Sequence, residues 1–317
     1  MRRARPVLAL LGVVTVCLAF CPVAEPRASD PNSAPTIQEL ESHPVQVVTG
    51  AGLSVSASDS TAMAGYQKFL ALQASDPKLR AEALRRLGDL NLDAGELQRM
   101  QSELSSIDLH GAEAIKLYTT LLAIYPDYEH NDEVLYQLAR AYDTTGQPDQ
   151  ALHTLDLIVQ RYPLAPNIDE VQFRRGELLF SSRRYAEAEQ AYAVVIARGA
   201  ISQYYVQSLY KSGWSLYKAS LPKQSLPDFA KLLDCELLGP DGRVRPLTDL
   251  RRADRELVED TLRVMSITFS QESGAQSIGR FVGQYGARPY DSLLYSRLGD
   301  LYVVKQRYQD AAATYLA

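Results

Sequence analysis

The chain has 317 residues, a formal net charge of −5 and 46% apolar residues. A chain of this length can bury a substantial core. Its acidic balance argues against nucleic acid or an anionic lipid surface as partner, because recognition of either needs clustered lysine and arginine.

The sequence begins with a basic stretch that an apolar run follows. Arg2, Arg3 and Arg5 precede residues 7–20, which are uncharged and largely apolar, and small residues come next. This order predicts a bacterial-type secretory signal over residues 1–28. The apolar run has 14 residues, fewer than the roughly 20 that a helix needs to cross a bilayer. We therefore expect export to the periplasm, and the loss of four arginines and one glutamate would take the formal charge from −5 to −8.

Three ways of processing this signal stay open. The run Leu18-Ala-Phe-Cys21 is similar to a lipoprotein cleavage box, in which Cys21 would be acylated and would attach the chain to the outer membrane. Phe20 departs from that box, because the residue before the cysteine is normally small. The alternatives are ordinary cleavage near Ala24 or Ala28 and a retained membrane anchor.

Residues 29–60 are rich in serine, proline, aspartate and small residues and show no sustained apolar period. This composition predicts a flexible tether. Residues 61–317 follow as a predicted array of helical repeats. Its start is irregular: residues 64–77 resemble a second helix without a partner, and the stretch around Gly88 resembles a first helix with an insertion before His110.

A spacing of 37 residues then recurs three times. The same place in a helix-turn-helix unit is taken by Ala114, Ala151, Ala188 and Ser225. Units that resemble one another at such a period cannot bury their apolar faces alone, so neighbours stack into a solenoid with a continuous core. The spacing therefore predicts an all-α fold.

Small side chains recur where paired helices must approach. A helical hairpin closes tightly only if one side chain on each partner is small. The pairs that satisfy this, each twelve residues apart, are Ala139 with Ala151, Gly176 with Ala188, and Gly213 with Ser225. A glycine inside a helix costs about 1 kcal/mol relative to alanine, so Gly176 and Gly213 indicate a packing requirement.

The unit over residues 134–163 resembles the tetratricopeptide repeat. The residues that carry the resemblance are Leu135, Leu138, Ala139, Tyr142, Gly146, Ala151, Leu155 and Pro163. It implies an α-solenoid of tetratricopeptide-like helical hairpins with a right-handed superhelix. The family unit usually has 34 residues, and the three extra residues here lie between units. In one such joint we expect Asn167 to cap the next helix together with Glu170.

The array becomes irregular after Leu233. Residues 235–246 read as a loop, helices resume at about Asp254, and Ser277 with Phe281 mark the second half of a divergent unit. The pattern restarts over residues 295–315, and the sequence stops at residue 317 inside a second helix. Solenoids normally finish with a polar-faced capping helix, so we expect an array truncated at its C-terminus.

Residue patterns that carry chemistry are missing from the sequence of the array. The four histidines are scattered, without the spacing of a metal site. No glycine-rich phosphate loop or serine nucleophile elbow occurs, and paired acids recur at helix starts, where they complement the helix dipole. Cys235 has no partner for a disulfide once the signal is removed. We expect no enzymatic activity, no metal and no cofactor.

In this repeat family the first helices line the concave surface. By the resemblance, the candidate partner-binding residues are Tyr136, Arg140 and Asp143 in one unit, Phe173, Glu177 and Phe180 in the next, and Tyr210, Trp214 and Tyr217 in the third. Aromatic side chains are enriched at binding hot spots, so this set indicates a groove for a peptide or a partner helix. The alternative for Phe173, Phe180 and Trp214 is packing against neighbouring units.

The sequence most resembles tetratricopeptide proteins of the Gram-negative envelope. The residues concerned are Arg161-Tyr-Pro163, Asp169 and Arg175-Gly176. These proteins include components associated with the TonB and Tol systems and the lipoprotein of the outer-membrane β-barrel assembly machine. The resemblance implies a non-catalytic adaptor for an envelope protein or peptide segment, as in a TonB/Tol-type system. A lipoprotein of the β-barrel assembly type and the repeat part of a longer envelope enzyme are the alternatives.

Overall fold

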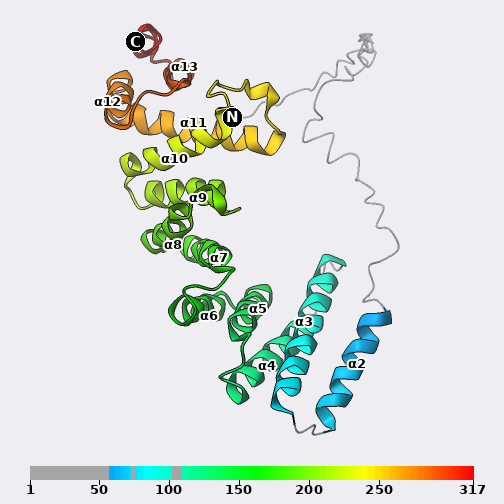
Figure 1. Cartoon of the computed structure of the whole chain (residues 1–317). Helices are drawn as coiled ribbons and strands as arrows, with labels where there is room; N and C mark the ends of the chain where they lie inside the picture. The colour runs from blue at the N-terminus through cyan, green and yellow to red at the C-terminus, as the bar shows by residue number, and fades with distance from the viewer. Residues whose placement is uncertain (1–56, 73–75, 102–108) are drawn as a thin grey trace, which may run out of the picture. The chain divides into compact units, whose positions relative to one another are not determined.

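The computed structural model describes residues 57–72, 76–101 and 109–317 (Figure 1). The predicted signal and nearly all of the predicted tether lie outside these residues. The helices are α2 (Ala57–Ala71), α3 (Pro77–Gln101), α4 (Leu109–Ile124), α5 (Asn131–Thr144), α6 (Pro148–Arg161), α7 (Ile168–Ser181), α8 (Tyr185–Ala197), α9 (Tyr205–Lys218), α10 (Pro222–Leu237), α11 (Arg252–Gln271), α12 (Ala275–Tyr285), α13 (Asp291–Val304) and α14 (Tyr308–Leu316). Short 3₁₀ turns occupy Gly199–Ile201 and Leu247–Asp249.

The predicted all-α solenoid is confirmed. Apart from one isolated antiparallel bridge between Leu238 and Val244, the described residues form helices and loops. From α2 to α14 each helix contacts the next in chain order, as Figure 1 shows. First helices also contact first helices across a unit, α3 with α5 and α11 with α13. The fold is therefore a row of helical hairpins, each packed on its neighbours.

The core follows the 37-residue spacing. Ala114, Ala151, Ala188 and Ser225 are all 0% exposed, which confirms their predicted place in the packing. The buried apolar residues form successive clusters, and the first three overlap in sequence: residues 84–141, 135–171 and 152–192. A fourth covers residues 209–311. Each cluster joins neighbouring hairpins, as expected of a quasi-linear core.

The glycines of the first helices accommodate aromatic rings of the second helices. A β-carbon on Gly176 would lie 2.5 Å from Cε1 of Tyr192, and one on Gly213 would lie 2.5 Å from Cε1 of Phe229. Gly88 meets Tyr118 and Gly299 meets Tyr315 in the same way. The packing requirement predicted from Gly176 and Gly213 is real. Each of these glycines contacts the ring sixteen residues further on, and not the small residue twelve residues further on as predicted.

In three hairpins the ring carries a hydroxyl that an acid accepts. Each acid directly follows the first-helix glycine, and the pairs are Tyr118 with Asp89 at 2.8 Å, Tyr192 with Glu177, and Tyr315 with Asp300 at 2.7 Å. Where the ring is Phe229, which has no hydroxyl, Trp214 takes the place of the acid. The acid is thus present where the ring carries a hydroxyl, which is buried with its ring for Tyr118 and Tyr192 and exposed for Tyr315.

In four of the hairpins the turn ends the first helix in the same way. Gly146, Arg183, Ser220 and Gln306 all adopt φ values between 58° and 76°. At the first turn the amide of Gly146 donates to the carbonyl of Asp143, and that of Gln147 donates to the carbonyl of Tyr142. The same two bonds recur at the other three turns. This is the Schellman arrangement, which satisfies carbonyls left without partners at a helix end.

Two local predictions differ from the structure. Asn167 stands at the N-cap of α7 but makes no side-chain capping bond. The carboxylate of Glu170 is taken by Tyr136 and Arg174, so it cannot complete a capping box. Part of the insertion predicted before His110 is helical, because α3 runs on to Gln101, and residues 102–108 lie outside the described residues. The later loop begins at residue 238, after α10 has ended.

No helix within the described ranges combines the length and the apolar character needed to cross a membrane.

We predict that Gly176→Ala lowers the free energy of unfolding by about 1–3 kcal/mol, because its β-carbon overlaps the ring of Tyr192. Gly283→Ala is the matched control. Its β-carbon has no neighbour within 4 Å, so better helix propensity raises stability by up to about 1 kcal/mol. Chemical denaturation measures both.

Gly176→Ala combined with Tyr192→Leu reproduces the Ala139 and Leu155 pair of the neighbouring hairpin. The double variant should lose less stability than the sum of the two single variants. Additive losses, or the same sign for both glycine substitutions, would contradict the ring contact.

Candidate functional site

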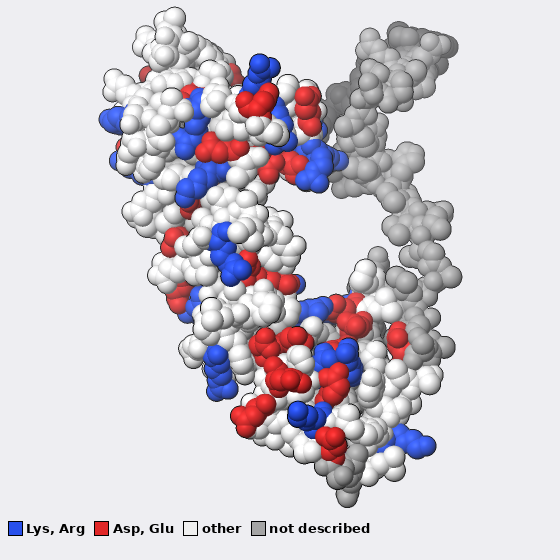
Figure 2. Space-filling model, in the orientation of Figure 1, with Lys and Arg blue, Asp and Glu red and all other residues white. Residues whose placement is uncertain are grey.

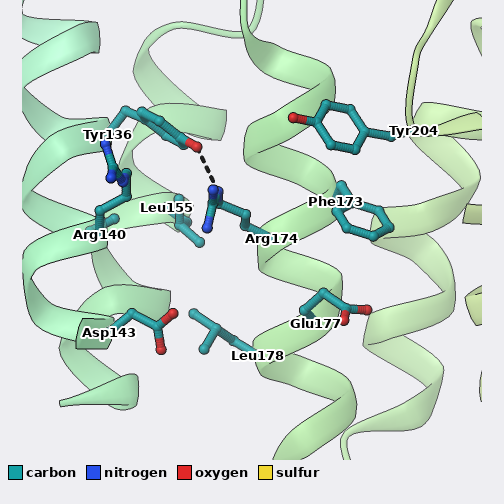
Figure 3. Close-up of a pocket in the computed structure, with 10 residues that line it drawn as sticks. Tyr136, Arg140, Asp143, Leu155, Phe173, Arg174, Glu177, Leu178 and Tyr204 are labelled. Atoms are coloured by element: carbon teal, nitrogen blue, oxygen red, sulfur yellow. Dashed lines mark hydrogen bonds between the residues drawn. The ribbon is translucent and has the colours of Figure 1, made fainter. Parts of the chain in front are cut away.

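A pocket opens on the first-helix side between α5 and α7. Its volume is about 290 Å³. The residues that line it are Tyr136, Ala139, Arg140, Asp143, Leu155, Phe173, Arg174, Glu177, Leu178 and Tyr204, which we call the first-helix pocket. Figure 3 shows α5 contributing Tyr136, Arg140 and Asp143, and α7 contributing the facing side chains from Phe173 to Leu178.

The floor of the pocket is apolar and its walls are aromatic. Ala139 and Leu155 are buried, and Leu178 is half-buried above them. On one wall, Phe173 stacks on Tyr204 with ring centroids 5.0 Å apart. Phe173 also lies 5.9 Å from the ring of Tyr192. These contacts hold the wall in place before any partner arrives.

A hydrogen-bonded group joins α5 to α7 at one edge. The hydroxyl of Tyr136 donates to Glu170 and accepts from Nε of Arg174 at 2.6 Å, the bond drawn in Figure 3. Arg174 also lies over the Tyr136 ring and pairs with Glu170 at 3.2 Å. Arg140 pairs with Glu96 of α3 at 2.5 Å. Both arginines of the pocket are therefore held by acids of this chain.

The acids of the pocket differ in their partners. Glu177 accepts from the hydroxyl of Tyr192 and pairs with Lys211 of α9 at 2.8 Å. Asp143 is exposed, and its carboxylate makes no hydrogen bond or ion pair with any residue that the structure describes. Arg99 lies nearby but donates to the backbone oxygen of Thr144, at 2.5 Å.

The pocket lies where the ring-on-glycine contact is missing. The first-helix position that is glycine in four hairpins is Ala139 here, and the ring position sixteen residues on is Leu155. Leu155 reaches less far than Tyr192 or Phe229, and both Ala139 and Leu155 line the cavity. The short side chain leaves open the space that a ring occupies in those four hairpins.

Five of the nine predicted site residues line this one pocket: Tyr136, Arg140, Asp143, Phe173 and Glu177. The remaining four lie outside it and are half-buried. Phe180 lies 5.5 Å from the ammonium group of Lys211 and packs edge-on against Tyr185. The partner-binding role of all nine residues stays a prediction.

The three aromatic residues predicted on α9 pack together. Trp214 lies edge-on to Tyr210 and Tyr217, with ring centroids 6.3 and 5.5 Å away, and to Phe229 at 6.4 Å. Tyr210 donates to Asp260 of α11 at 2.8 Å. These contacts connect α9 to its hairpin partner and to the next unit.

Five residues of the pocket were not predicted as site residues: Ala139 and Leu155 were assigned to packing, and Arg174, Leu178 and Tyr204 were missed altogether. Arg174 and Leu178 each neighbour a predicted groove position on α7, so the helical face that meets α5 is wider than the stripe assigned to it. Tyr204 belongs to the joint before α9. The three extra residues in the joints were a signal that such a segment could reach the groove.

The buried and half-buried phenols of this region do not act as bases. Burial and the bond to Glu170 raise the pKa of Tyr136, and burial and the bond to Glu177 raise the pKa of Tyr192. Burial also raises the pKa of Tyr204, and burial with the bond to Asp260 raises that of Tyr210 to about 12. All four are neutral at physiological pH, so none supplies a phenolate.

Burial opposes the charge of Arg174, but Tyr136 and Glu170 outweigh it and raise its pKa. The pocket is thus built for contact and charge pairing. Within residues 57–72, 76–101 and 109–317 no group of three or more histidine, cysteine or acidic residues is placed to hold a metal ion.

Comparison with known proteins supports this assignment of the fold. Residues 110–172 match the family model described as tetratricopeptide repeat. The match covers α4 to α6, the start of α7, and with them one side of the first-helix pocket. No curated protein matches the chain.

Several solved structures are similar at low sequence identity. A tetratricopeptide repeat protein from Parabacteroides merdae shares 17% identity over 82% of this chain and 91% of its own, with a TM-score of 0.39. BtubC from P. vanneervenii shares 14% over 81% and 85%, with a TM-score of 0.44. MamA from Desulfovibrio magneticus shares 13% over 72% and 91%, with a TM-score of 0.37.

The helical-repeat fold and the repeat match together support a scaffold for protein interaction. The repeat match over residues 110–172 supports, within that class, a tetratricopeptide-repeat protein.

We predict that the pocket can be filled from within. Leu155→Phe alone should destabilise the chain by about 1–3 kcal/mol, because the new ring meets the β-carbon of Ala139. Adding Ala139→Gly reproduces the Gly213 and Phe229 pair and should recover stability, although the glycine itself costs about 1 kcal/mol. Chemical denaturation and a crystal structure of this closed-pocket variant test it. A double variant no more stable than Leu155→Phe would contradict our account of the cavity.

Proposed function

We propose that this chain is a non-catalytic scaffold that holds a segment of a partner protein against its first helices. One partner side chain occupies the first-helix pocket. The observation that carries the proposal is a cavity of about 290 Å³ with an apolar floor, aromatic walls and a charged rim. Small-molecule sites typically enclose about 300–1,000 Å³, so this cavity lies at the small end of that range, a size that a single side chain can fill.

The walls meet the requirements of an anchoring pocket. Binding energy at protein interfaces concentrates where a side chain enters a well-packed, desolvated pocket with aromatic walls. Phe173 and Tyr204 are already stacked, and Tyr136 is already bonded to Glu170 and Arg174. Because these side chains are held before binding, little conformational entropy is lost when the partner docks.

The partner that we propose is a protein of the bacterial cell envelope, in a TonB/Tol-type complex in the periplasm. The basic start followed by the apolar run of residues 7–20 supports export. Acidic and basic side chains are interspersed over the face shown in Figure 2. A mixed surface of this kind suits a protein partner better than nucleic acid, which requires a basic patch.

A photo-crosslinking amino acid in place of Tyr204 tests the proposal in cells. We expect a discrete covalent adduct with an envelope protein, and loss of that adduct in the closed-pocket variant. The same amino acid at exposed Tyr308 of α14, remote in sequence from the pocket, is the control position. An adduct at position 204 that persists when the pocket is closed would argue against binding there.

The second candidate is an outer-membrane lipoprotein of the β-barrel assembly type, which Cys21 favours. Mass spectrometry of the mature chain distinguishes the two. Cleavage near Ala24 or Ala28 is expected for the periplasmic adaptor, and an acylated Cys21 as the first residue for the lipoprotein. Recovery of the protein in the cytoplasm with residues 1–28 intact would exclude both.

A further inference from the structure

The acids of the first-helix pocket give it a preference for charge. Figure 3 shows Asp143 and Glu177 on the side of the pocket away from the bond between Tyr136 and Arg174, with Leu178 between them. Both arginines of the pocket are paired, Arg140 with Glu96 and Arg174 with Glu170. A new acidic group would have to displace one of these acids.

Asp143 is the acid of the pocket that can still accept hydrogen bonds or pair with a cation. Among the described residues its carboxylate has no partner, although it borders a cavity with apolar walls. Glu177 already accepts from Tyr192 and Lys211. Each carboxylate oxygen can accept more than one hydrogen bond. An incoming cation would therefore meet one free carboxylate and a second that is partly used.

The rest of the pocket fits the stem of a long basic side chain. Lysine and arginine bury their methylene groups along apolar surface while their charged heads stay at polar groups. Leu155 and Leu178 supply the apolar surface.

On the basis of the proposed function, we propose that the partner side chain held by the first-helix pocket is basic, an arginine or a lysine. Its stem lies over Leu155 and Leu178, and its charged head pairs with Asp143 at the edge that Glu177 shares. An acidic side chain is disfavoured, since it would face Asp143 and compete with Glu96 and Glu170.

Capped amino acids test this directly. The probes are the N-acetyl methylamides of arginine, of citrulline, which has nearly the same shape without the charge, and of glutamate. Binding to the purified protein is followed through the NMR signals of the Leu155 and Leu178 methyl groups. We expect arginine to bind about two- to fivefold more tightly than citrulline, the range of a partly exposed ion pair, and glutamate to bind least.

Two variants assign the preference. Asp143→Asn should remove the advantage of arginine over citrulline and leave citrulline binding unchanged. Asp127→Asn, the same charge change at an exposed position in the loop before α5, should leave the advantage intact. The closed-pocket variant should bind none of the probes.

The outcomes separate this inference from the proposed function. Equal binding of arginine and citrulline, or an advantage that survives Asp143→Asn, overturns the preference for a basic side chain while the pocket stands. If none of the probes shifts the NMR signals of the Leu155 and Leu178 methyl groups, the preference for a basic side chain is overturned as well. The crosslink at position 204 then decides whether the groove still holds a partner.

Discussion

The structure depends on one contact, the ring of a second helix lying against the bare backbone of its first helix. Gly88, Gly176, Gly213 and Gly299 allow it, because a β-carbon at any of them would overlap the ring. Where the ring is tyrosine, the next residue is an acid that accepts its hydroxyl. One contact thereby sets helix spacing, burial and the polarity of a position that faces the groove.

The hairpin of α5 and α6 departs from this rule, and the departure creates the candidate site. Ala139 and Leu155 keep the helices packed, but without the ring a cavity remains. Because Leu155 has no hydroxyl, the residue after Ala139 does not have to be an acid that accepts a hydrogen bond. That residue is Arg140, and it pairs with Glu96 of α3. In this hairpin Ala139 and Leu155 stand in place of a glycine and an aromatic ring, and space that the ring would fill is a cavity open to another molecule.

The sequence was informative where periodicity reports burial directly. The spacing of Ala114, Ala151, Ala188 and Ser225 predicted the repeat, and Gly176 pointed to a close approach. The sequence was less informative about which atoms meet at Gly176. The pattern of small residues pairs Gly176 with Ala188, whereas the contact is with the ring of Tyr192, sixteen residues on. Tyr204 could not be found from helical faces, since it lies in a joint. Asp169 and Arg175, which suggested envelope relatives, form ion pairs with Arg198 and Asp156 at 2.6 Å. That likeness therefore reports helix packing as much as any shared partner.

The left-handed turns have a further consequence for the stability of the array. Arg183, Ser220 and Gln306 hold a backbone conformation that glycine adopts freely at the corresponding Gly146, and each non-glycine residue there costs roughly 1–2 kcal/mol. The three corners therefore lower the stability of their hairpins relative to a corner that carries glycine. Glycine at one corner at a time would relieve this cost, so that the stability of a chosen hairpin could be raised without changing its contacts.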